Sequence, residues 1–243
     1  MRPALGMMVA LGAALLLTGA AGAQPNPQEI QQAMTPADVL QQLKEGNGRF
    51  VRGEPRKRDS GNEIKATAGG QHPTAAVLGC IDSRIPVEAI FDAGIGDMFV
   101  ARVAGNVADP DIAGSLEFAT KVVGAKVVLV MGHTRCTAVR SACEHLELGN
   151  ITGLLQKIAP AVDAVKGVPG GRDCNNDAFV DAAVQENVRL TMRKLREMSP
   201  ILKGLEDSHD IMIVGALYDV STGKVEFLDA DGAAPGGPPV KGP

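Results

Sequence analysis

The sequence has few of the residues that define whole classes of small and nucleic-acid-binding proteins. Its 243 residues include four Cys, no Trp and one Tyr, so the chain is too long and too poor in Cys to be a disulfide scaffold. Basic residues are not in excess either, because 24 Lys and Arg face 28 Asp and Glu, which argues against a general nucleic-acid binder. The hydrophobic fraction of 45% excludes a disordered chain. The open question is what the few Cys and His do.

The first 23 residues have the pattern of a secretory signal peptide. A basic start is followed by an apolar run over residues 4–20, and residues 21–23 are the small residues Ala-Gly-Ala. A transmembrane anchor is the alternative, but this run is short and rich in Ala and Gly. No Cys precedes Cys80, which excludes a lipid-modified Cys at the cleavage site. We therefore expect a secreted protein, periplasmic in a two-membrane bacterium, with no membrane span after cleavage.

The rest of the chain divides into a polar lead-in (residues 24–34), one domain (35–230) and a Gly/Pro-rich tail (231–243) that we expect to be disordered. Short apolar runs in the domain alternate with amphipathic segments. The predicted strands are 75–79, 98–103, 126–131, 211–217 and 224–228, and the predicted helices between them are 86–93, 114–123, 137–146, 151–165 and 178–198. This order predicts an α/β fold, with a mostly parallel β-sheet core flanked by helices.

A further helix is predicted ahead of the first strand. It begins at Thr35, a favourable N-cap that is followed by Pro and an acid, and it ends at Gly46 and Gly48. The next segment, residues 49–58, carries five basic residues. We interpret this segment as a solvated basic loop, with contacts in an oligomer as the alternative.

One His and two Cys are predicted to meet at one edge of the sheet. Cys80 follows the first strand, His133 follows the third, and Cys136 comes three residues later. Functional groups of a parallel sheet gather at the carboxyl ends of its strands. Two thiolates and one imidazole suit Zn²⁺ and leave a fourth position for water or substrate. Each residue alone is more often structural, so the combination carries the prediction.

Asp82 and Arg84 are predicted to serve the same site. Asp82 lies two residues after Cys80 and can reach the metal or its water, while Arg84 can hold that carboxylate in a bidentate pair. With Asp82 held by Arg84, the fourth position is free. Released, Asp82 could occupy it as a fourth ligand in a closed state. The alternative is an ordinary surface ion pair, which contributes little.

These motifs are similar to those of the β-class carbonic anhydrases, of the secreted bacterial type. The family's Cys-x-Asp-x-Arg signature is present at residues 80–84 and its His-x-x-Cys signature at residues 133–136. Further similar segments are 96–106, 114–118, 185–188 and 215–220, so the resemblance covers nearly all of the domain. It implies one Zn²⁺ per subunit, bound by Cys80, His133 and Cys136. It also implies reversible hydration of CO₂ to bicarbonate and a proton, by zinc-bound hydroxide that the Asp82–Arg84 dyad orients.

The resemblance extends to substrate and assembly. Gln71 matches a Gln that hydrogen-bonds substrate in some members, and Phe99 matches a residue of an apolar CO₂ pocket shared between subunits. A loop Gln and a strand-core Phe are the alternatives. A homodimer or tetramer is implied. Two other functions stay open: a CS₂ or COS hydrolase of the same fold, and a zinc-binding homologue without catalysis.

The other Cys and His lie outside these motifs. Cys143 and Cys174 either form a disulfide that pins the loop 167–176 in an oxidising compartment, or remain free thiols. We expect the other three His to lie on the surface: His72, His145 and His209.

Overall fold

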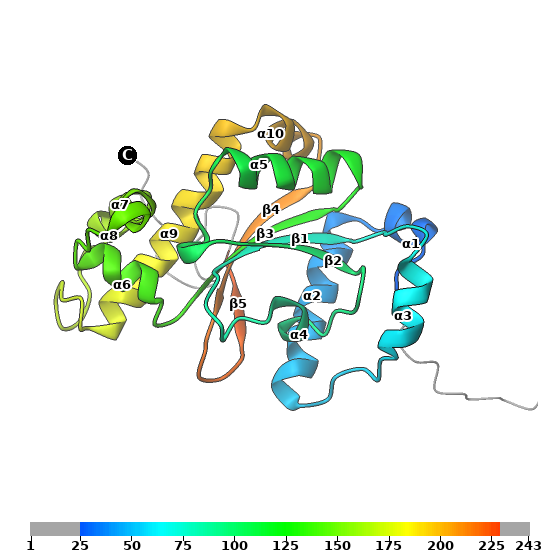
Figure 1. Cartoon of the computed structure of the whole chain (residues 1–243), viewed down its shortest axis with the longest axis horizontal. Coiled ribbons are helices and arrows are strands. Elements are labelled where there is room, and N and C mark those ends of the chain that lie inside the picture. Colours follow the sequence, from blue (N-terminus) through cyan, green and yellow to red (C-terminus); the bar gives the residue numbers. More distant parts are fainter. Residues whose placement is uncertain (1–24, 229–243) are drawn as a thin grey trace, which may run out of the picture.

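The computed structural model describes residues 25–228, and its centre is a five-stranded sheet covered by helices on both faces (Figure 1). The strands are β1 (Ala75–Gly79), β2 (Met98–Arg102), β3 (Val127–His133), β4 (Met212–Tyr218) and β5 (Val225–Phe227). They lie in the order β2-β1-β3-β4-β5, and only β5 is antiparallel to its neighbour. The α/β fold with a mostly parallel sheet is therefore confirmed. The predicted signal peptide and tail lie outside the described residues.

Helices cover both faces of the sheet and one of its ends. The amino-terminal helices are α1 (Gln28–Ala33), α2 (Pro36–Arg52), α3 (Ser60–Thr67) and α4 (Val87–Ile90). The later ones are η1 (Ala104–Asn106), α5 (Pro110–Glu117), η2 (Phe118–Val122), α6 (Thr137–Cys143), α7 (Gly149–Gln156), α8 (Ala159–Ala164), α9 (Asp177–Met198) and α10 (Pro200–Asp207). Helices α5 and α10 lie above the sheet in Figure 1 and α2 and α4 below it. Helix α9 runs from α10 down to the end where α6, α7 and α8 gather.

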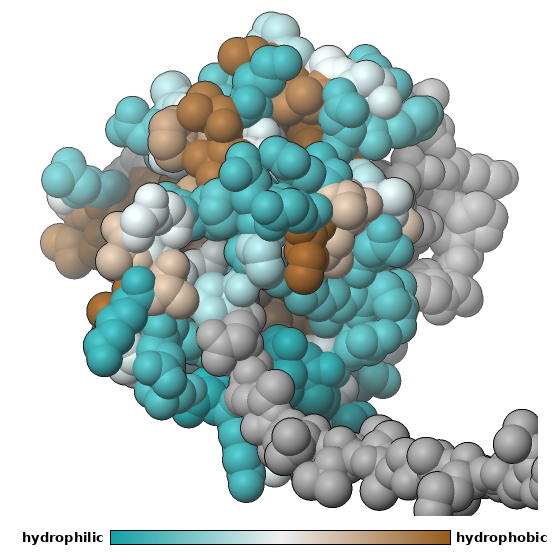
Figure 2. Space-filling model, turned by 90° about the vertical axis from the view of Figure 1, so that its right-hand side faces the viewer, coloured by the Kyte–Doolittle hydropathy of each residue, from teal (hydrophilic) through white to brown (hydrophobic). Residues whose placement is uncertain are grey.

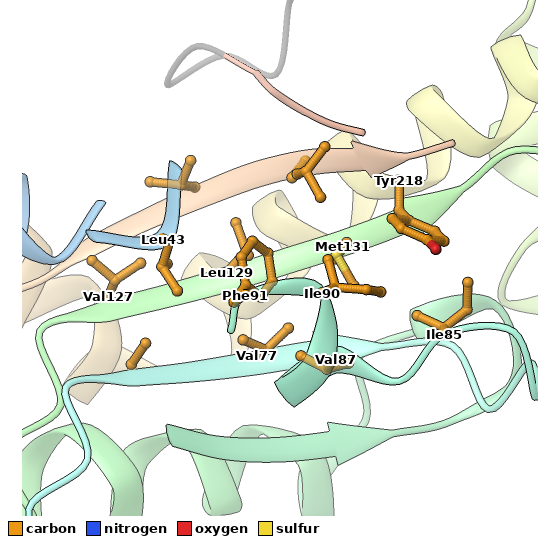
Figure 3. Close-up of a cluster of buried hydrophobic side chains, with 14 of the residues drawn as sticks. Leu43, Val77, Ile85, Val87, Ile90, Phe91, Val127, Leu129, Met131 and Tyr218 are labelled. Carbon is orange, nitrogen blue, oxygen red and sulfur yellow. The ribbon is translucent and has the colours of Figure 1, made fainter. Parts of the chain in front are cut away.

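The two faces of the sheet follow from the alternation of side chains along each strand. Val77 and Leu129 point into the layer formed with α2 and α4, which Figure 3 shows from the side. Their neighbours Ala76 and Val128 point into the opposite layer, against α5, α9 and α10. Every residue of β3 is buried, which explains its continuous apolar sequence.

The prediction that the first helix ends at Gly46 and Gly48 is wrong. Helix α2 continues to Arg52 and ends at Gly53, which adopts a left-handed conformation with a φ of 68°. Gly46 is instead needed for packing, since a Cβ there would lie 2.0 Å from the carbonyl oxygen of Phe91. The glycine therefore lets α2 lie directly on the backbone that follows α4.

The interpretation of residues 49–58 as a solvated loop is also wrong for three of its arginines. Arg49 and Arg56 pair with the buried Asp92 carboxylate, at N···O distances of 2.6 and 3.2 Å. Arg58 pairs with buried Glu63 at 2.9 Å. Buried carboxylates need such partners because an unpaired charge is costly away from water. The basic segment thus ties α2 to α3 and to the end of α4.

Several helices differ from their predicted extents. Four were not predicted: α1 within the polar lead-in, α3, the short 3₁₀ helix η1, and α10. The predicted helix 151–165 is divided into α7 and α8, and Pro160 lies in the first turn of α8. Within the lead-in, the Gln31 side-chain amide is buried and donates to the carbonyl oxygens of Pro73 and Val123, at 2.7 and 3.0 Å. The lead-in is therefore packed against the domain from α1 onwards.

Cys143 and Cys174 form a disulfide, with their Cα atoms 5.7 Å apart. It joins the end of α6 to the loop before α9. Of the three histidines predicted on the surface, His145 and His209 are exposed and His72 is half-buried. The end of the molecule that carries α1 and α3 is mostly hydrophilic, with separate apolar patches (Figure 2). Across residues 25–228, no helix has the length and apolar character needed to cross a bilayer.

Candidate metal centre

Three potential metal ligands converge at the carboxyl edge of the sheet. Cys80 directly follows β1, His133 is the last residue of β3, and Cys136 is the N-cap of α6. Their ligand atoms all lie within 4.8 Å of one another, and all three side chains are buried. The structure thus brings together the three residues that the sequence predicted as ligands.

The ring of His133 is oriented for metal binding. Its Nδ1 lies 3.0 Å from the carbonyl oxygen of Thr134, and because a carbonyl only accepts, Nδ1 must carry the proton. In the neutral ring the other nitrogen, Nε2, is then an acceptor, and it is buried without a hydrogen-bond partner among the described residues. Buried polar atoms are nearly always satisfied. A cation bound between Nε2 and the two sulfurs would satisfy this one.

The two thiols of the cluster shift each other's pKa in opposite directions. The Cys136 thiol, hydrogen-bonded to the Cys80 sulfur, lowers the pKa of Cys80, although burial opposes the shift. The same contact and burial raise the pKa of Cys136. Binding a dication would remove the second proton, because the metal ligand is the thiolate. Two thiolates and one neutral imidazole are a donor set that fits Zn²⁺.

Asp82 and Arg84 form an ion pair beside the three ligands. Arg84 donates from Nε and Nη2 to the two oxygens of Asp82, at 2.9 and 2.7 Å. This bidentate pairing lowers the pKa of Asp82 to about 2. Asp82 Oδ2 lies 3.9 Å from His133 Nε2. The carboxylate is therefore ionised, next to the cluster and held by Arg84.

Two further arginines hold the loops of the site, and the sequence did not single them out. Arg102 donates to the carbonyl oxygens of Cys80 and Asp82, at 2.9 and 2.6 Å. Arg135 has a left-handed φ of 55°, and its N–H donates to Asp181 Oδ1 at 2.7 Å. The position of Arg102 at the carboxyl end of β2 was a usable signal, because that end lies at the same edge of the sheet.

Gln71 and Phe99 do not join the three ligands within one chain. Gln71 is exposed and precedes β1, whereas Cys80 follows this strand, which spans about 16 Å. Phe99 pairs with Ala76 near the amino end of β1. Its side chain lines a groove of about 690 Å³ between β2 and α5. The rings of Phe99 and Phe118 meet edge-on, with their centroids 6.4 Å apart.

Comparisons with known proteins indicate the family of this chain. The profile of the family named Carbonic anhydrase matches residues 75–225, a range that contains all three ligands and the Asp82–Arg84 pair. The crystal structure of the β-carbonic anhydrase CafA of Aspergillus fumigatus superposes with a TM-score of 0.62 at 25% identity, covering 80% of this chain and 90% of that one. The chain belongs to the β-class carbonic anhydrase family.

Other carbonic anhydrases match over a similar extent. Carbonic anhydrase 2 of Mycobacterium tuberculosis is 36% identical over 202 residues, which cover 80% of this chain and 93% of the relative. A structure from a study of two tetrameric β-carbonic anhydrases of Sordaria macrospora shares the fold, with a TM-score of 0.61 at 21% identity. This match covers 79% of this chain and 95% of the other. The family relationship therefore extends well beyond the metal centre.

Proposed function

We propose that this β-carbonic anhydrase binds one Zn²⁺ through Cys80, His133 and Cys136, and catalyses the reversible hydration of CO₂ to bicarbonate and a proton. The observation that carries the proposal is the buried Nε2 of His133, which lies beside two thiols and has no hydrogen-bond partner within residues 25–228. Membership of the family supports the reaction, and the nearby carboxylate of Asp82 supports catalysis rather than metal storage.

The protein's own groups would position the water that attacks CO₂. A bound Zn²⁺ supplies the Lewis acidity that makes water a nucleophile near neutral pH. Asp82 would accept a hydrogen bond from this water and so direct a lone pair of the water oxygen toward the carbon of CO₂. Arg84 fixes both oxygens of Asp82, and Arg102 fixes the backbone on either side of Ile81. The attack would form one C–O bond as one C=O π bond of CO₂ breaks and its electron pair moves to oxygen, and the proton lost by the water would pass to buffer.

Stopped-flow CO₂ hydration, measured together with the zinc content, tests this proposal. We expect about one zinc per chain and turnover that is lost with a chelator and restored by zinc. COS and CS₂ are assayed in parallel. Hydrolysis of either without CO₂ hydration would replace the proposed substrate, and bound zinc without any turnover would identify a non-catalytic homologue.

We also propose that the enzyme is a homodimer or a tetramer, in which a second chain completes each site. Phe99 and the 51% exposed Phe118 line the groove beside β2, an edge strand with an unpaired side. Exposed apolar grooves and open strand edges are favourable places for association. Gln71, which is remote from the ligands of its own chain, would then act in the site of the neighbouring chain.

Replacing Phe118 with Arg should convert the wild-type oligomer into smaller species, because a charge would be buried in the interface. Analytical ultracentrifugation measures the change. Leu148→Arg is the control, since Leu148 is also exposed, at 61%, but lies outside the groove. A Phe118→Arg protein with the wild-type sedimentation coefficient, or a monomeric wild type, would refute this interface.

Finally, we propose that residues 1–23 are cleaved during export and that the mature enzyme is periplasmic. The Cys143–Cys174 disulfide supports this location, because disulfides persist in oxidising compartments. N-terminal sequencing of the exported protein should begin near Gln24. Alkylation without reductant should leave Cys143 and Cys174 unlabelled, and a mature protein that still contains the first residues would contradict the proposal.

A further inference from the structure

A short chain of hydrogen bonds connects helix α9 to one of the metal ligands. The Asn187 side-chain amide donates to the carbonyl oxygen of Gly105 at 2.6 Å, and the Gly105 N–H donates to Cys80 Sγ at 3.4 Å. We propose that Asn187 is a positioning residue of the zinc centre, which acts through Gly105 on the Cys80 thiolate. This inference rests on the proposed function, because it assigns the relay to the zinc-bound state.

The Gly105 turn can make these contacts only in one conformation. Its φ of 69° lies in the left-handed region, and a Cβ would lie 2.4 Å from Ile158 Cδ1. Glycine is therefore required by both backbone and space. Because the N–H and the carbonyl of Gly105 are held by different partners, removing the Asn187 amide would free one side of the turn and let the N–H rotate away from Cys80.

Helix α9 is a rigid support for this relay. Asn187 is 1% exposed and is followed by Val188, which packs on the sheet. A Cβ at Gly132, the residue before His133, would lie 2.6 and 2.8 Å from side-chain carbons of Val184 and Val188. The helix thus lies directly on the end of β3. One helix face therefore sets both the strand that carries His133 and the turn that contacts Cys80.

The hydrogen bonding of Asn187 differs from that of a purely structural buried amide. Asn47, which is 5% exposed, uses both ends of its side chain: it donates to Ile90 and Gly223 and accepts from the N–H of Val225. The Asn187 oxygen has no partner among the described residues. Only the donor end of Asn187 is used, and its target is the turn at the ligand.

An N–H···S bond changes a thiolate ligand in two ways. It directs the sulfur lone pairs, and it withdraws charge from the sulfur, which alters the metal–sulfur bond. Outer-shell partners of metal ligands typically change metal affinity by about 10–100-fold. We expect a loss of this size when the Asn187 donor is removed, together with a changed electronic spectrum of the metal–thiolate bond.

The test compares Asn187→Ala with Asn47→Ala in the full chain. The readouts are zinc affinity by competition with a chelator, and the sulfur-to-metal charge-transfer band of the Co²⁺-loaded protein. Asn187→Ala should bind zinc about 10–100-fold more weakly and shift this band. Asn47→Ala should lower the stability to denaturant while leaving both readouts at wild-type values, because it loses a buried amide that does not touch the ligands.

Wild-type zinc affinity and an unshifted band in Asn187→Ala would overturn the relay, and equal changes in Asn47→Ala would reduce it to a general effect of destabilisation. A wild type that binds no zinc would instead refute the proposed function. If Asn187→Ala does not fold, the relay is tested by NMR on the wild type loaded with an NMR-active cadmium isotope. A scalar coupling between the metal and the Gly105 amide proton is expected through the N–H···Sγ bond, and its absence would refute the relay.

Discussion

Replacing His133 with Ala should yield a protein that retains almost no zinc and hydrates CO₂ no faster than uncatalysed background. His133 provides the only nitrogen of the three-ligand set, and its Nδ1 is already held by Thr134. Without it, two thiolates alone would have to bind the cation. The loss in zinc affinity should exceed the roughly 10–100-fold effect of outer-shell changes. Cys80→Ser should behave in the same way, since a hydroxyl is a far poorer ligand than a thiolate.

Zinc per chain, determined by metal analysis after dialysis, measures this effect alongside stopped-flow turnover. His145→Ala is the matched control, because His145 is exposed and lies outside the ligand cluster. It should keep full zinc and full activity. Circular dichroism shows whether each variant is folded. A folded His133→Ala enzyme with normal zinc content and turnover would refute the metal centre proposed here.

The sheet and the three ligands could be predicted because their signals are local. The β-branched run before His133 is buried along its whole length, so its sequence pattern is that of a strand covered on both faces. Once the strands are known, a parallel sheet brings their carboxyl ends to one edge. Cys80 and His133 follow from this rule, and Cys136 follows from its spacing to His133.

Contacts between distant segments left no such signal. Glycine is favoured at helix ends, so Gly46 indicated the end of the helix. In the structure Gly46 is needed because α2 packs against the backbone of Phe91, which lies 45 residues further along the chain. The arginines of residues 49–58 likewise appear solvated until Asp92 is placed beside them. Asn187 has the spacing of a core position on α9, and only the folded chain brings its amide to Gly105.

Gln71 and Phe99 show a different limit. Both are remote from the ligands of their own chain, so a role in substrate binding would require contact with the site of a second chain. Their positions have functional meaning only if a second chain brings them to the ligands, and the sequence pattern of one chain contains no signal for that contact. The sedimentation experiment on Phe118→Arg therefore also bears on these two residues.

Replacing Asp82 with Asn should separate catalysis from metal binding. Asp82 is not one of the three ligands, so the variant should retain zinc. Asn can still accept one hydrogen bond from Arg84, but it lacks the charge that makes Asp82 a strong acceptor for the attacking water. Positioned acid–base groups typically contribute at least about a hundredfold to a rate, and we expect a loss of this order in kcat.

The pH dependence gives this prediction a second readout. Arg84 lowers the pKa of Asp82 to about 2, below its ordinary value, so the ion pair contributes stability above that ordinary value. This contribution is lost as the pH falls toward about 2, and Asp82→Asn should lack this part of the acid dependence. The Asn side chain of the variant does not ionise, so raising the pH should not rescue the variant's rate.

The matched control for Asp82→Asn is Asp207→Asn, which removes the charge of an exposed carboxylate that pairs with Lys203 on α10. Surface pairs of this kind contribute little, so Asp207→Asn should keep both zinc and rate. If Asp82→Asn retained zinc and turned over CO₂ at the wild-type rate, Asp82 would be a structural ion-pair partner of Arg84. The attacking water would then have to be oriented by another group.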